Sequence, residues 1–65
     1  MSRGSPPSPD GREILIEFVR NGAWLKCSAV DAATGREASA IGPAADPAGL
    51  ERIAIAKLKR LLAQG

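Results

Sequence analysis

The sequence predicts a small α+β domain, a three-stranded antiparallel β-meander with one C-terminal α-helix packed on one face, in the order β-β-β-α. Three observations support this prediction. An Asn-Gly pair at positions 21–22 separates two runs of strand-type sequence, and a second turn sequence follows at residues 31–36. After Pro47 the apolar residues then recur at helical spacing.

The chain has 65 residues, enough for one domain with a modest core. Residues 1–12 consist almost entirely of Ser, Pro, Gly and charged residues, which have little apolar surface to bury. We therefore expect a disordered N-terminal tail over residues 1–12 and a single β-β-β-α domain over residues 13–65.

The first hairpin is predicted from Asn21 and Gly22. Asn-Gly between alternating apolar runs favours a type I′ turn, because both central residues of that turn need a positive φ. Arg20 then lies opposite Ala23, and stepping outwards sorts the remaining side chains onto two faces. The predicted inner face is apolar and pairs Phe18 with Leu25, Ile16 with Cys27, and Ile14 with Ala29. The predicted outer face is mixed and pairs Val19 with Trp24, Glu17 with Lys26, Leu15 with Ser28, and Glu13 with Val30.

The second turn is predicted from the sequence DAATGR at residues 31–36. Asp31 can bond the backbone ahead of it, and Gly35 can adopt the left-handed conformation that closes a four-residue loop. Pairing Asp31 with Arg36 places small residues on the inner face, where they leave room for the side chains of a helix. The predicted inner pairs are Ala29 with Ala38 and Cys27 with Ala40, and the outer pairs are Val30 with Glu37, Ser28 with Ser39, and Lys26 with Ile41.

The helix is predicted to begin after Asp46, an N-cap residue followed by Pro47 at the first helical position. Pro43 ends the third strand because it has no N–H to donate. Lys57 lies at the edge of the apolar stripe, where we expect its stem to cover the core while its ammonium stays in water. The stripe itself comprises Leu50, Ile53, Ala54, Leu58, Leu61 and Leu62.

The composition argues against most kinds of catalytic activity. The chain has no His and no Tyr, which removes the side chain best suited to proton transfer near neutral pH. Cys27 is the only cysteine and falls on the inner face, where it acts as a small hydrophobic residue. Phosphate-binding glycine motifs are absent. We therefore expect no enzyme activity, no cofactor and no metal. With no disulfide and no membrane-spanning stretch, we expect a cytoplasmic protein.

The outer face of the predicted sheet gives the strongest indication of function. One helix leaves it uncovered, and a contiguous apolar patch of this size is rare on a monomer. The first strand is also an apolar edge strand without Pro, which favours pairing with another chain. Both features predict self-association, as a homodimer, or binding to an unknown protein partner. The milder alternative is that Trp24 and Val19 only form a stabilising cross-strand pair. The candidate interaction residues are Leu15, Val19, Trp24, Val30 and Ile41.

A competing hypothesis is a nucleic-acid-binding accessory protein that uses the basic face of the helix. The net charge of +2 is too small to argue for nucleic acid by itself. The predicted open sheet face exposes Glu13, Glu17 and Glu37 against Lys26, which also argues against this partner. The residues of this basic face are Arg52, Lys57, Lys59 and Arg60.

Four segments of the chain are similar to a known family. They are Ile16-Glu17-Phe18, AVDAATG at residues 29–35, Ile41-Gly42-Pro43-Ala44, and the helical stretch at residues 50–58. On these segments the chain resembles a family of short uncharacterised proteins from alphaproteobacteria, over residues 13–62. The resemblance implies the extent of the domain and brings no site residues with it.

Overall fold

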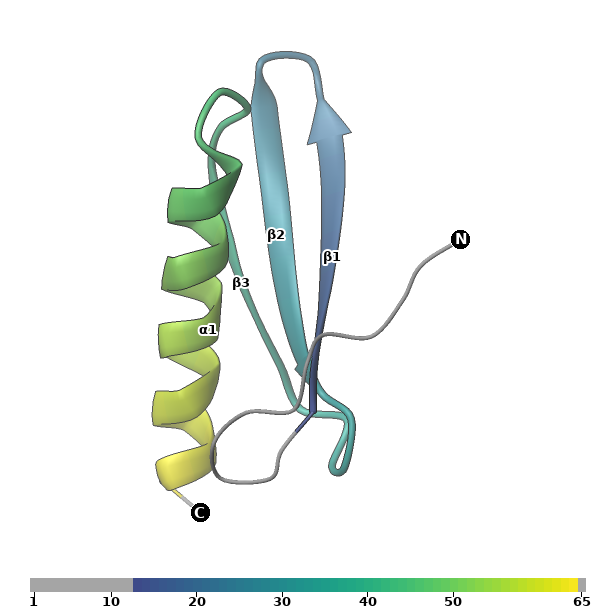
Figure 1. Cartoon of the computed structure of the whole chain (residues 1–65), viewed down its shortest axis with the longest axis vertical. Coiled ribbons are helices and arrows are strands. Elements are labelled where there is room, and N and C mark those ends of the chain that lie inside the picture. Colours follow the sequence, from purple (N-terminus) through teal and green to yellow (C-terminus); the bar gives the residue numbers. More distant parts are fainter. Residues whose placement is uncertain (1–12, 65) are drawn as a thin grey trace.

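The computed structural model describes residues 13–64, and the tail predicted at residues 1–12 lies outside them. Strands β1 (Ile14–Asn21), β2 (Trp24–Asp31) and β3 (Glu37–Pro43) are followed by the helix α1 (Pro47–Ala63). The strands form one antiparallel sheet in the order β1-β2-β3, so β2 is central. Figure 1 shows the helix running alongside the sheet. The predicted β-β-β-α fold is confirmed.

The first hairpin has a different register from the predicted one. Asn21 lies opposite Trp24, so the two loop residues are Gly22 and Ala23. Gly22 has a φ of 62°, and no non-glycine residue in the described part of the chain has a positive φ. A positive φ at the first central residue alone matches a type II′ turn, which takes Gly there. The prediction of a type I′ turn is therefore wrong.

The new register moves every cross-strand partner by two residues. Phe18 lies opposite Cys27, and Glu17 lies opposite Ser28 instead of Lys26. The predicted pairing of Val19 with Trp24 is also wrong, since Val19 lies opposite Lys26. Because side chains alternate with a period of two, a shift of two residues leaves each side chain on its predicted face.

The second turn follows the prediction. Asp31 donates its N–H to the carbonyl of Arg36 at 2.8 Å, and Gly35 donates to the carbonyl of Asp31 at 2.7 Å. Gly35 has a φ of 76°. The Thr34 hydroxyl donates to the fully buried Asp31 carboxyl at 2.7 Å and accepts the N–H of Arg36 at 3.2 Å. These bonds explain the sequence of this turn, and the β2–β3 register agrees with the predicted pairs.

The helix begins as predicted. The Asp46 side chain accepts the N–H of Gly49 at 3.1 Å, and Pro47 is the first helical residue. Leu50, Ala54 and Leu58 are buried. Ile53 was predicted to lie in the same stripe, but its side chain is 49% exposed.

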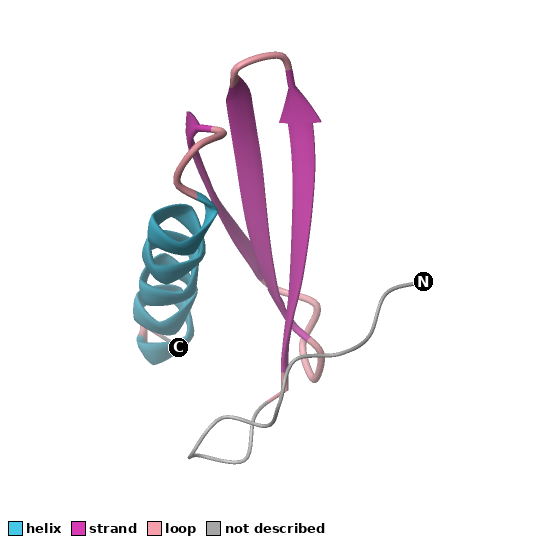
Figure 2. Ribbon diagram, turned by 45° about the horizontal axis from the view of Figure 1, so that its top comes forward, coloured by secondary structure: helices cyan, strands magenta, loops and turns pink. Residues whose placement is uncertain are grey.

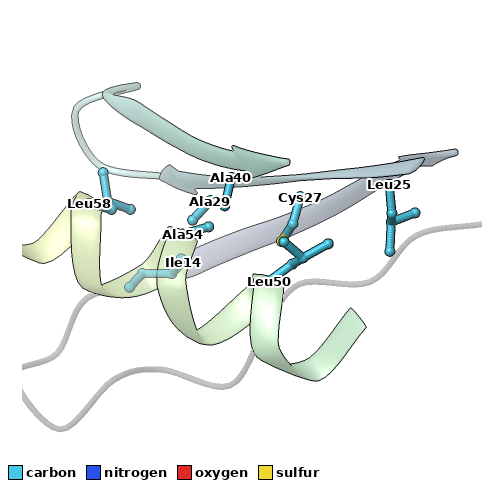
Figure 3. Packing of buried hydrophobic residues seen from close by; sticks show 8 residues of the cluster. All are labelled: Ile14, Leu25, Cys27, Ala29, Ala40, Leu50, Ala54 and Leu58. Atoms are coloured by element: carbon cyan, nitrogen blue, oxygen red, sulfur yellow. The ribbon is translucent and has the colours of Figure 1, made fainter. Parts of the chain in front are cut away.

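The core lies between α1 and the inner face of the sheet, and β1 contributes Ile14 to it (Figure 3). Small residues on the sheet let the helix approach closely. At Gly42, an added Cβ would lie 2.7 Å from Cδ2 of Leu50, so a larger residue there would force the Leu50 side chain to move. The buried apolar residues are Ile14, Leu25, Cys27, Ala29, Ala40, Leu50, Ala54 and Leu58.

The helix packs mainly against β3 and β2. Figures 1 and 2 both place β1 at the side of the sheet away from α1. The sheet is therefore covered unevenly, and β1 is the strand with the least cover.

Candidate interaction surface

The outer face of the sheet exposes apolar side chains as predicted. Trp24 is 60% exposed and Ile41 is 67% exposed, and Leu15 and Val19 are also exposed. Val30, the fifth predicted residue, is half-buried. The prediction that Trp24 faces away from the helix is confirmed.

The sheet register separates these outer side chains into two groups. The register places Glu17, Ser28 and Ser39 in one row across the three strands. Leu15 and Val30 lie on one side of this polar row, and the other apolar residues lie on the opposite side. A partly open hollow with a volume of about 260 Å³ lies among that second group, and Lys26 is part of its wall. The hollow is lined by Val19, Asn21, Trp24, Leu25, Lys26 and Ile41.

The inner face of β1 changes from buried to exposed along its length. Ile14 is 5% exposed and belongs to the core, whereas Ile16 is only half-buried. Phe18 was predicted to lie beneath the helix, but it is 40% exposed. The physical reason is the position of α1 over β2 and β3, which leaves the part of β1 near the first turn without cover.

The hydrogen-bond pattern shows which backbone groups of β1 point to its free edge. Ala32 donates its N–H to the carbonyl of Glu13 at 3.0 Å, so the odd-numbered residues of β1 bond to β2. The N–H and C=O groups of the even-numbered residues therefore point away from β2. Among residues 13–64, no strand lies on that side of β1. The residues whose backbone groups point to this free edge are Ile14, Ile16, Phe18 and Arg20.

The free edge of β3 differs from that of β1. Arg36 and Asp31 form a bonded pair, so Ser39 points its carbonyl away from β2. Lys57 of α1 donates its ammonium to this carbonyl at 3.1 Å. Pro43 has no N–H to offer a further strand. A lysine and a proline at a strand edge both oppose pairing with another chain.

The four residues of the predicted basic helix face are all exposed. They do not act as one group, because Lys57 is bonded to Ser39 at the edge of β3. Lys57 is exposed, which agrees with the prediction, and its hydrogen bond to Ser39 is an additional contact. Arg52, Lys59 and Arg60 remain on the exposed helix surface.

Cys27 is completely buried at the interface between β2 and the helix. Burial raises the pKa of its thiol, and the negative charge of Glu51 raises it further. A thiol with a raised pKa is a poor nucleophile. Within residues 13–64, no three His, Cys, Asp or Glu side chains come together in a group that could hold a metal ion.

Sequence reasoning identified the outer face but missed the contrast between the two strand edges. The sequence held one signal for this contrast. Lys57 interrupts the apolar side of the helix, and a lysine near a strand edge is a common way to prevent pairing.

A family model described as a domain of unknown function (DUF6898) matches residues 11–65. This match confirms the resemblance to an uncharacterised domain family, while the alphaproteobacterial origin stays a prediction. No curated protein and no solved structure matches the chain. Among the described residues, no helix is long and apolar enough to cross a membrane.

Proposed function

The chain belongs to a domain family of unknown function (DUF6898), and we propose that this domain is a non-enzymatic protein-interaction module that binds a second copy of itself to form a homodimer. The observation that carries the proposal is the poor burial of β1. Of its eight residues only Ile14 is buried, whereas five of the eight residues of β2 are. Phe18 on one face and Val19 on the other both remain exposed. An apolar strand exposed on both faces needs a neighbour.

A second copy of the chain is the partner that this surface fits best. Two identical strand edges complement each other in an antiparallel pair, because each offers the same alternation of N–H and C=O groups. The domain is also small, and within residues 13–64 its core contains eight buried apolar residues. A dimer adds buried apolar area that one copy lacks.

The composition supports a role without catalysis. The chain has no His or Tyr, and its one cysteine is buried. We place the protein in the cytoplasm, because a fold with one cysteine does not depend on a disulfide or on an oxidising compartment.

Light scattering coupled to size-exclusion chromatography of the full chain tests the proposal. An interface built around one strand is smaller than the standard interface of about 1,600 Å². The protein should therefore be measured from low to high micromolar concentration. We expect the mass of a dimer at the upper end and a shift towards the monomer on dilution. A mass that stays that of a monomer throughout would overturn the proposal.

A further inference from the structure

We propose that the homodimer forms by antiparallel pairing of the two β1 edges around a two-fold axis at Phe18, which joins two sheets into one sheet of six strands. This inference rests on the proposed homodimer and specifies its interface. The strand order would be β3-β2-β1-β1-β2-β3. It assigns the contact to the strand edge and not to the outer face of the sheet.

The first argument is the difference between the two edges. β1 presents N–H and C=O groups from four consecutive even-numbered positions and contains no Pro. At β3, Lys57 already occupies the carbonyl of Ser39, and Pro43 lacks an N–H. Only the β1 edge therefore offers a complete row of backbone groups. Pairing at that edge alone gives a closed dimer, since β3 stops the sheet from growing.

The second argument is the position of the helix. A two-fold axis perpendicular to the sheet keeps both helices on the same side of the six-stranded sheet. Each helix lies over its own β2 and β3, so the uncovered inner faces of the two β1 strands meet at the centre. Phe18, which is 40% exposed in one copy, then lies directly opposite Phe18 of the other copy. An aromatic pair at this point supplies the cover that α1 does not.

The third argument concerns the register. If the axis passed through Glu17, the two Glu17 carboxylates would lie directly opposite each other, which is destabilising. A shift that centres the axis on Phe18 places Glu17 opposite Val19 of the other copy instead. Ile16 then lies opposite Arg20, whose aliphatic stem can cover it. If the axis instead passed through Ile16, Phe18 would lie opposite Ile14, which is already buried in its own core.

The outer face is a weaker candidate for the contact. Its apolar residues are divided by the row of Glu17, Ser28 and Ser39. A dimer formed by stacking two outer faces would have to bury Glu17 and Lys26 as well. Burying charges that lack a well-placed partner is costly.

Three variants of the full chain, measured by light scattering across the same concentrations as the wild type, test the interface. Phe18→Pro removes an N–H that points to the free edge, and Phe18→Ala removes the side chain but keeps that N–H. Trp24→Ser tests the outer face. Circular dichroism of each variant checks whether it is folded.

We expect Phe18→Pro to weaken dimerisation more than tenfold, because two interchain hydrogen bonds are lost in the symmetric pair. Phe18→Ala should weaken it less, and Trp24→Ser should leave it unchanged. If Trp24→Ser gives a monomer and Phe18→Pro stays a dimer, the edge interface is wrong but the homodimer stands. A wild-type monomer at every concentration would overturn both proposals.

Disulfide trapping provides a second readout that does not depend on whether Phe18→Pro folds. In a Cys27→Ala background, Glu17→Cys combined with Val19→Cys should form interchain disulfides, because these positions face each other in a non-hydrogen-bonded pair. Glu17→Cys alone should stay reduced. Efficient cross-linking of Glu17→Cys alone would place the axis at Glu17 and overturn the register. A lack of cross-linking in both would overturn the edge pairing.

Discussion

Replacing Gly42 by Ala should destabilise the domain through a single contact. The new Cβ would lie 2.7 Å from Cδ2 of Leu50, whereas carbon atoms in contact prefer a separation of about 3.5–4.0 Å. Leu50 is buried, so it has little room to move aside. Overpacking of this kind costs about 1–3 kcal/mol in the free energy of unfolding.

A double-mutant cycle isolates this contact. Leu50→Ala alone should cost about 2–5 kcal/mol, because it leaves a cavity under β3. In the Leu50→Ala background the clash is gone, so Gly42→Ala should cost almost nothing. The two changes should therefore show a coupling of about 1–3 kcal/mol.

The assay is urea unfolding monitored by the fluorescence of Trp24. All variants are measured at the same protein concentration and in the same concentration of a stabilising osmolyte, so that their free energies of unfolding can be compared. The control combines Gly42→Ala with Ile53→Ala, since Ile53 is exposed and should give additive costs. If the costs of Gly42→Ala and Leu50→Ala also add to within about 0.5 kcal/mol, the proposed close packing of β3 against the helix is refuted.

Thr34→Val removes the hydroxyl that donates to the buried Asp31 and should cost about 1–3 kcal/mol in urea unfolding. Thr34→Ser should stay near the wild type, and an equal loss in both would contradict this role. Burial raises the pKa of the Cys27 thiol, so the folded state holds the proton more tightly than the unfolded state. The free energy of unfolding should then fall as the pH rises above about 8.5, by at most about 1.4 kcal/mol per pH unit. Cys27→Ala should abolish this fall, and its persistence in that variant would point to another group. Lys57→Ala frees the carbonyl of Ser39 and should produce species larger than a dimer in light scattering, whereas Lys57→Arg should not. An unchanged dimer in Lys57→Ala would show that Lys57 does not protect this edge.

Much of the fold could be predicted because several local signals agree. Asp31 and Gly35 fix the second turn, and Asp46 with Pro47 fixes the start of the helix. The alternation of side chains gave the correct faces even though the first turn was misassigned. The same alternation hid the error, because a shift of two residues moves no side chain to the other face.

The first register could not be obtained from local sequence alone. Gly22 fits both a type I′ turn as its second central residue and a type II′ turn as its first. The structure has the type II′ turn. Turn propensities do not include the tertiary contacts that accompany this turn. Ala44 donates its N–H to the carbonyl of Ala23 at 2.8 Å, and Arg20 donates from Nε to the carbonyl of Gly22 at 2.9 Å.

The candidate site could be predicted only in part, because it depends on where the helix lies across the sheet. Helical periodicity shows which side chains face the sheet, but it does not show which strands they cover. Phe18 has the pattern of a core residue and is exposed because α1 lies over β2 and β3. The same limitation explains why Ile53, which fits the apolar stripe, remains exposed.

Hydrogen exchange of the Phe18 amide, followed by NMR as the protein concentration is raised, tests the edge interface most directly. In one copy this N–H points away from β2, and in the proposed dimer it bonds to the second copy. We predict that protection of the Phe18 amide rises with the fraction of dimer, while the outward-pointing amide of Ile41 stays unprotected. Rapid exchange of Phe18 at concentrations where the protein is a dimer would contradict the account.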